Sequence, residues 1–325
     1  NSLFLTVLGH DQRNVTRITT IHLVGLQIPQ SITVLVFFLF LILYCVTICG
    51  NLLIITLVSY SNSLHSPMYF FLSQLSALDL MLSTDILPNM ISTVLVNKTT
   101  MSFSGCLAQF SFCAITGCSE CLLLTAMSWD RYLAICRPLH YTLKMNYQVC
   151  WMLVVLCWIS GIFVVLINNL SISKLEFCGP NVIDHFFCDL DPIMQLSCSD
   201  TTIAHLEMTI MGAIILIFPF FTIFVSYSYI IVTILKIPSI TDRQKVFSTC
   251  SSHLTVVSMF YGTLVCVYLT PRRGQTQTLN KLLSLLYTVI TPMMNPIIYS
   301  LRNKDLKKAA RRLINHLSRI CFSKD

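Results

Sequence analysis

The sequence predicts an all-α membrane protein, a seven-transmembrane helix bundle with a short amphipathic cytoplasmic eighth helix. Of its 325 residues 55% are hydrophobic and only 11% are charged, whereas soluble domains carry about 25% charged residues. Mean hydropathy is +0.73. Seven apolar stretches also reach the length of about 20 residues that a helix needs to cross a bilayer. This composition excludes a disordered chain, a nucleic-acid-binding module and a secreted disulfide scaffold.

Charged and turn-forming residues bound the seven predicted spans. The spans cover residues 31–58, 67–96, 104–137, 147–170, 203–236, 243–270 and 281–302. An outer segment, 1–30, precedes them, a long acidic loop, 171–202, forms a lid over the bundle mouth, and a tail, 303–325, follows them. The lack of an internal repeat argues against a transporter built from duplicated halves.

Orientation follows from the distribution of positive charge. Of the 21 Lys and Arg residues, 14 flank one side of the predicted bundle and 7 flank the other. Because the richer side faces the cytoplasm, we expect a multi-pass plasma-membrane protein with its N-terminus outside and its tail inside. A glycosylation sequon at Asn14 lies on the expected outer side.

Four of the 15 cysteines fall on the outer side, where disulfides are stable. They are Cys106, Cys178, Cys188 and Cys198, and they allow three pairings, between which the sequence alone does not choose. The others lie in spans or on the cytoplasmic side, where packing is the simpler interpretation. We expect no metal site, although His185 precedes Cys188 in the lid.

Two acids in the spans mark a buried polar site. A carboxylate at mid-span is costly and normally functional, and both Asp79 and Glu120 lie at that depth. With Asn51 and Asn295 they would form one polar cavity. Two neighbouring carboxylates require a sodium ion or a proton between them; the alternative is polar contacts between helices, satisfied by water.

The string Asp130-Arg131-Tyr132 stands where the third span meets the cytoplasm. Arg131 would pair with Asp130 in one state of the bundle and face a partner in another. The alternative is an arginine whose head group simply reaches the membrane interface.

Several motifs occur in a fixed order across nearly the whole chain. They are Gly50-Asn51, Pro67 to Leu72, Leu75 to Asp79, Met127 to Cys136, Ser226-Tyr227, Lys245 to Leu254, and Pro292 to Tyr299. The chain therefore resembles a vertebrate olfactory receptor of the rhodopsin-like (class A) G-protein-coupled class, and the strings in the third and sixth spans separate this family from other rhodopsin-like receptors. Trp129 and Val246 are conservative departures from the family pattern.

The resemblance implies functional roles for matching residues. It implies a sodium pocket at Asp79 and Glu120, and disulfides Cys106–Cys188 and Cys178–Cys198. It also implies a stimulatory heterotrimeric G protein that raises cyclic AMP as the partner. The residues expected to form the activation switch and coupling region are Asp130, Arg131, Tyr132, Tyr227, Asn295, Pro296 and Tyr299.

A ligand pocket is expected in the outer half of the bundle. Cys113, Ala114, Gly117 and Cys118 recur on one helical face, which the resemblance turns inward. The facing residues would be Met211, Ile215, Tyr261, Leu264, Val265, Tyr268 and Thr288. This small, apolar set suits a neutral, volatile organic ligand, and the uncharged Cys113 disfavours a cationic monoamine. Tyr261 would otherwise be a packed core aromatic.

The expected function is therefore odorant binding and G-protein activation, with no enzymatic activity and no cofactor other than the ion. A non-olfactory chemoreceptor of the same fold is the nearest alternative, and a transporter or channel is a more distant one. The basic tail from Asn303 to Phe322 suits contact with the lipids of the anionic inner leaflet rather than nucleic acid, and Cys321 would be a palmitoylation site.

Overall fold

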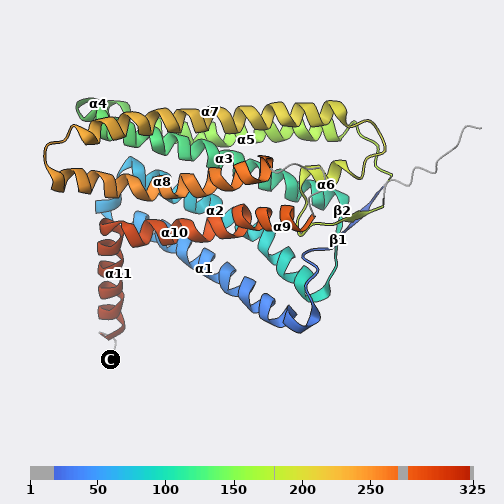
Figure 1. The fold of residues 1–325 in the computed structure, drawn as a ribbon. Coiled ribbons are helices and arrows are strands. Elements are labelled where there is room, and N and C mark those ends of the chain that lie inside the picture. The colour runs from blue at the N-terminus through green and yellow to red at the C-terminus, as the bar shows by residue number, and fades with distance from the viewer. Residues whose placement is uncertain (1–17, 179, 270–276, 323–325) are drawn as a thin grey trace, which may run out of the picture.

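The structure is a computed structural model that describes residues 18–178, 180–269 and 277–322. Long helices run side by side in a bundle (Figure 1). They are α1 (Thr33–Tyr60), α2 (Pro67–Val96), α3 (Phe103–Cys136), α5 (Tyr147–Ile172), α7 (Thr202–Leu235), α8 (Ile240–Leu269), and α9 (Gln277–Leu285) continued by α10 (Thr291–Arg302).

Six helical stretches in the described part of the chain are long and apolar enough to cross a membrane, namely Gln30–Tyr60, Pro67–Val96, Phe103–Cys136, Tyr147–Ile172, Thr202–Leu235 and Thr278–Leu301. Helix α8 has 30 residues and lies in the same bundle (Figure 1), but its first turns carry Asp242 and Arg243. Large apolar side chains such as Phe38 and Phe221 are exposed on the outside of the bundle, as expected where lipid replaces water. The protein is thus a multi-pass membrane protein.

Local sequence signals explain where several helices begin. Pro67 occupies the first turn of α2, where its missing N–H is not needed. The side chain of Ser102 accepts the Gly105 N–H at 3.0 Å at the start of α3, and Asn146 accepts the Val149 N–H at 2.9 Å at the start of α5. These are N-caps, and they account for starts within one residue of the predicted spans.

Two glycines allow helices to approach closely. A Cβ on Gly161 of α5 would stand 2.9 Å from the main-chain oxygen of Ile115 in α3. A Cβ on Gly50 of α1 would stand 3.0 Å from the Pro296 ring in α10. Between such contacts the core is apolar and includes the fully buried Phe71, Leu75 and Met127.

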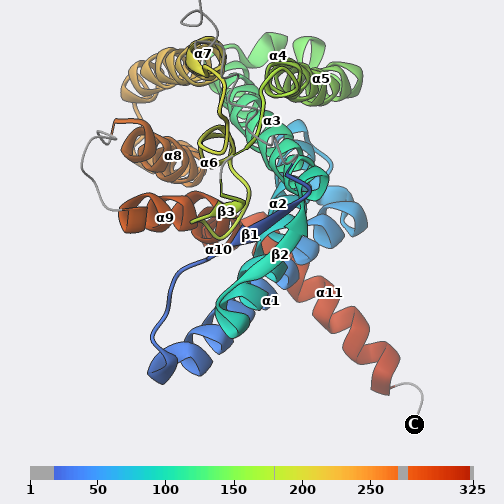
Figure 2. The same cartoon turned by 90° about the vertical axis from the view of Figure 1, so that its right-hand side faces the viewer.

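The outer end contains a small β-sheet that the all-α prediction did not include. Strand β1 (Thr20–Leu23) lies between β2 (Thr99–Ser102) and β3 (Val182–Ile183), antiparallel to the first and parallel to the second. The strands, each of four residues or fewer, come from the N-terminal segment, the loop after α2 and the lid. Figure 2 shows them together at the outer end of the bundle. Strands this short, far apart in sequence, give no clear periodic signal.

Two disulfides hold the lid. Cys106 at the start of α3 is bonded to Cys188, with a Cα–Cα distance of 5.4 Å. Cys178 is bonded to Cys198, with a Cα–Cα distance of 5.8 Å. These are the pairs that the family resemblance implies. A short helix, α6 (Leu190–Met194), lies in the lid between Cys188 and Cys198.

The seventh span is longer than predicted and is not a regular α-helix throughout. It starts at Gln277, and a π-helical turn, η3 (Leu286–Ile290), interrupts it. Pro292 follows directly, and it has no N–H with which to continue the α-helical ladder. The Thr291 hydroxyl donates to the Leu286 carbonyl at 3.0 Å, five residues earlier.

The end of the bundle opposite the lid, which the sequence predicts to face the cytoplasm, carries two further helices, α4 (Pro138–Lys144) and α11 (Lys304–Phe322), and a short 3₁₀ turn (Asn62–Leu64). Helix α11 runs nearly perpendicular to the bundle (Figure 1). Asn303 ends α10 in an extended conformation, and its side-chain oxygen accepts the N–H of Asp305 at 2.9 Å and of Leu306 at 3.2 Å. Leu306 and Ala309 are buried, so α11 is amphipathic as predicted.

Candidate functional site

The predicted polar cavity forms where α1, α2, α3 and α10 meet. Asp79 is fully buried and accepts hydrogen bonds from the Asn295 side-chain nitrogen at 3.1 and 3.0 Å. Glu120 is 2% exposed and interacts with both Asp79 and Asn295. Asn51 donates to the carbonyl of Pro292 at 3.1 Å. The four predicted ion-site residues therefore lie in one region of the bundle interior.

Several oxygens around this cavity have no protein partner. They are Asn51 Oδ1, Ser83 Oγ, Glu120 Oε1 and Tyr299 Oη. Buried polar atoms normally find a partner, so this set points to a water or an ion. Carboxylate, amide and hydroxyl oxygens are the ligands of hard cations, and the residues present therefore fit a sodium ion. Ser83 was not predicted, although it lies one helical turn after Asp79.

Arg131 is held at the cytoplasmic end of α3. Its Nε donates to Asp130 Oδ2 at 2.8 Å, and an Nη2 contact to the same oxygen completes the ion pair. Tyr141 of α4 donates to the other Asp130 oxygen at 2.8 Å. The structure thus has both Asp130 oxygens occupied. Tyr141 was missed because nothing in its spacing relates it to Asp130.

The other predicted switch tyrosines make different kinds of contact. Tyr227 of α7 and His253 of α8 form a hydrogen bond of 2.6 Å. Tyr299, fully buried, interacts electrostatically with Asp79, Glu120 and Arg131. Tyr132 instead stacks against Trp129 with ring centroids 5.1 Å apart.

His253 was read from sequence only as part of the family string. Its side chain is fully buried, and the Tyr227 bond gives it a structural role between helices. Pro296 is packed against Gly50, so it belongs to the α1–α10 contact.

The structure brings only part of the predicted ligand set together. The Tyr261 hydroxyl lies 3.0 Å from Cys121 Sγ, which also lies 3.2 Å from the Ile215 carbonyl. Leu264 packs against the hydrophobic core cluster that contains Cys121 and Tyr261. Cys121 therefore joins α3, α7 and α8 at the floor of the predicted pocket, and sequence analysis had given it only a packing role.

The remaining ligand-set residues lie nearer the lid or the outer ends of the helices. Cys113 packs with a cluster that includes Phe186, Phe187 and Val289. Ala114 packs against a second cluster, which includes Cys188 and Ile193 of the lid. A Cβ on Gly117 would meet no atom within 4 Å. Gly117, Cys118 and Met211 are partly exposed, and Thr288 is buried. Asn14 and the side chains of Val265, Tyr268 and Cys321 lie outside the described residues.

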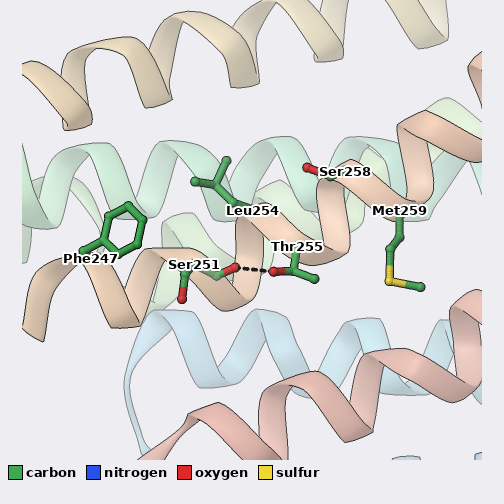
Figure 3. Close-up of a pocket in the computed structure, with 6 residues that line it drawn as sticks. All are labelled: Phe247, Ser251, Leu254, Thr255, Ser258 and Met259. Carbon is green, nitrogen blue, oxygen red and sulfur yellow. Dashed lines mark hydrogen bonds between the residues drawn. The ribbon is translucent and has the colours of Figure 1, made fainter. Parts of the chain in front are cut away.

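A hollow on the side of α8 is distinct from this set. Figure 3 shows its lining, in which the Thr255 hydroxyl donates to the Ser251 carbonyl at 2.7 Å. It is lined by Phe247, Ser251, Leu254, Thr255, Ser258 and Met259. None of these residues belongs to the predicted ligand pocket.

Polar contacts fix the lid to the bundle. Gln109 of α3 donates to the Asp85 carbonyl of α2 at 3.0 Å and accepts the N–H of Cys188 at 3.0 Å. Lys281 of α9, 6% exposed, donates to the Gly25 carbonyl at 2.7 Å and to Asp184 at 2.5 Å. The N-terminal segment, lid and seventh span therefore meet at Lys281.

His185 lies in the lid beside this contact. Its ring stands 4.6 Å from that of Phe186 and 4.7 Å from that of Phe187. Burial, and then the nearby Lys281 charge, lower the pKa of His185 to about 4. The imidazole is therefore neutral near neutral pH.

The helix arrangement is that of the rhodopsin fold. Squid rhodopsin superposes on the chain with a TM-score of 0.72, covering 88% of this chain and 81% of its own, at 16% sequence identity. At that identity the likeness establishes the fold alone.

Sequence comparison identifies the family. The family model described as "Olfactory receptor" matches residues 19–316. Olfactory receptor 11L1 of Homo sapiens is 44% identical over 313 residues, 96% of this chain and 97% of its own. Olfactory receptor 1496 of Rattus norvegicus is 46% identical over 301 residues, 93% and 97% of the two chains. The chain belongs to the olfactory receptor family, whose members are odorant-binding, G-protein-coupled signalling receptors and not enzymes.

Proposed function

We propose that the chain is a plasma-membrane odorant receptor that activates a stimulatory heterotrimeric G protein and so raises cyclic AMP. Its N-terminus would face outside and its tail the cytoplasm, in keeping with the basic residues of α11. The ligand would be a small, largely apolar organic molecule bound beneath the lid. Cys121, Ile215 and Tyr261 would form the pocket floor.

The observation that carries this proposal is a series of buried polar groups inside the bundle. Asp79 is hydrogen-bonded to Asn295, and the buried Tyr299 interacts electrostatically with Asp79, Glu120 and Arg131. A ligand changes the population of two packings only if it binds them with different affinity. Polar groups with unpaired oxygens in this series supply interactions that can differ between the packings.

A sodium ion or a proton at Asp79 and Glu120 completes the proposal. Two buried carboxyls would repel each other if both were charged and nothing lay between them. An ion held there would stabilise the packing whose oxygens surround it, by mass action. Raising sodium should therefore raise the melting temperature of the purified receptor, and Glu120→Gln should remove that dependence. A dependence unchanged in Glu120→Gln would contradict the site.

The coupling is tested in cells expressing the intact chain, with and without the stimulatory Gα subunit. Under the proposal, a panel of volatiles contains an agonist that raises cyclic AMP only when that subunit is present. Membrane lipids at α11 are tested with the same receptor in vesicles, where anionic lipid should protect Arg311 and Arg312 from modification. A ligand-gated current without the G protein would instead favour a channel.

A further inference from the structure

Asp85 of α2 is a further acid within the spans, and it has no role in the polar cavity or the switch. One of its carboxylate oxygens, Oδ2, is buried and has no hydrogen-bond partner. Neither the ion pair of Arg131 nor that of Lys281 includes it. Its main-chain carbonyl does have a partner, the Gln109 side chain at 3.0 Å. The local backbone is therefore fixed, while Oδ2 of the carboxyl group lacks a partner.

Asp85 lies beside the predicted ligand face of α3. It is close enough to Cys113 to interact electrostatically with it, and Asp189 of the lid interacts with the same thiol. Cys113 also packs with the apolar cluster of Phe186, Phe187 and Val289. A carboxyl group thus lies near Cys113, whose own side chain packs against apolar residues of the lid and the seventh span.

The burial of Asp85 Oδ2 without a protein partner favours a cationic partner for this carboxyl group. A carboxylate taken from water into an apolar region is costly unless an opposite charge compensates it. Lys281, a buried cation of α9, is already bound to Asp184 and to the Gly25 carbonyl.

We propose that Asp85 binds the protonated amine of a small organic amine, whose hydrocarbon part packs on the Cys113 face of α3. This inference rests on the proposed odorant-receptor function and names its ligand class. Sequence analysis favoured a neutral ligand because Cys113 carries no charge. The acid it did not assign, Asp85, supplies that charge from the neighbouring helix.

The test uses matched pairs of probes that differ only in the polar group: hexylamine against hexan-1-ol, and cyclohexylamine against cyclohexanol. Cells expressing the chain are compared for cyclic AMP at equal surface staining. Because hydrogen bonds to charged groups are the stronger ones, each amine should act at a concentration about tenfold or more below its alcohol. Asp85→Asn keeps the shape but removes the charge, and should abolish the amine's advantage.

The matched control is Asp200→Asn, which removes an exposed lid acid and should leave the amine's advantage unchanged. Asp85→Glu keeps a carboxylate and should retain it, which distinguishes lost recognition from misfolding if the Asn variant is absent from the surface. A thermal-shift measurement on the purified receptor with hexylamine reads binding without coupling, and Asp85→Asn should remove that shift too.

Three results would overturn the inference: amines inactive where neutral volatiles act, an amine advantage that survives in Asp85→Asn, or one lost equally in Asp200→Asn. The first leaves the proposed function intact, since a neutral agonist still raises cyclic AMP. A receptor that reaches the surface but responds to no volatile would instead refute the proposed function.

Discussion

Tyr227 and His253 form a hydrogen bond of 2.6 Å between α7 and α8. Both side chains are buried, at 4% and 0% exposure. Arg131 interacts electrostatically with both groups while its guanidinium is bound to Asp130. The packing seen is therefore one in which the arginine is engaged within its own chain.

Tyr227→Phe should raise basal cyclic AMP, because it removes one contact of this packing and leaves a buried His253 nitrogen unpaired. A net hydrogen bond of about 1 kcal/mol corresponds to a population shift of about fivefold. Cyclic AMP without agonist, at matched surface level, measures the effect. Tyr229→Phe is the control, since that side chain is 59% exposed on the same helix. Unchanged basal signalling in Tyr227→Phe would contradict this role.

Tyr141→Phe should also raise basal signalling, by a separate route. Tyr141 donates to Asp130 at 2.8 Å, and burial together with Asp130 raises the pKa of this phenol, so it stays protonated and remains a donor. Without it Asp130 loses one of its two partners, and Arg131 is held less firmly. A hydrogen bond to a charged group contributes about 1.5–3 kcal/mol, so we expect the population shift to be about tenfold or more and basal cyclic AMP to rise more than in Tyr227→Phe.

Tyr147→Phe is the control for Tyr141→Phe, because Tyr147 is 67% exposed at the start of α5. If Tyr141→Phe signalled less than the parent chain without agonist, the Tyr141 contact would belong to the active packing instead.

Gly161→Ala should reduce surface expression and thermal stability. The added Cβ would meet the Ile115 main-chain oxygen at 2.9 Å, and backbone atoms cannot move aside as a side chain can. Overpacking of this kind costs about 1–3 kcal/mol. Gly212→Ala is the matched control, since its Cβ would meet nothing within 4 Å. Equal melting temperatures for the two variants would refute the close α3–α5 contact.

Lid docking should weaken in acid through His185. Its pKa is lowered from 6.5 to about 4, so the undocked state binds a proton more readily than the docked one. The stability of the docked lid is therefore independent of this group above pH 6.5, and it decreases as the pH falls from 6.5 toward about 4. Protease cleavage within the lid, compared at neutral pH and midway between the two values, should increase. His185→Phe should remove that pH dependence, and a persistent dependence would assign it to another group.

The bundle could be predicted from sequence because its signals are local. Runs of apolar residues determine the spans, and caps such as Ser102 and Asn146 determine their starts. The small sheet could not be predicted from sequence, because β1 pairs with segments about 80 and 160 residues away. The π-turn at Leu286–Ile290 likewise depends on how the seventh span packs ahead of Pro292.

In the candidate site too, local sequence signals predicted some residues, while contacts between helices determined the others. Asp79, Glu120, Asn51 and Asn295 were predicted because polar residues in an apolar span are conspicuous. Tyr141 and Cys121 were not assigned such roles, because their importance comes from contacts with Asp130 and Tyr261 that only the packed helices create. Asp85 was not assigned a role from the sequence, because its place beside Cys113 depends on the relative rotation of α2 and α3.

The most direct test of the account is the cyclic AMP response of Arg131→Ala to an agonist found with the parent chain. Arg131 interacts electrostatically with the buried Tyr299, and its own side chain is 13% exposed. The account predicts that the variant reaches the surface at the parent's level and gives no agonist-dependent rise. A normal dose-response curve in Arg131→Ala would contradict the proposed mechanism.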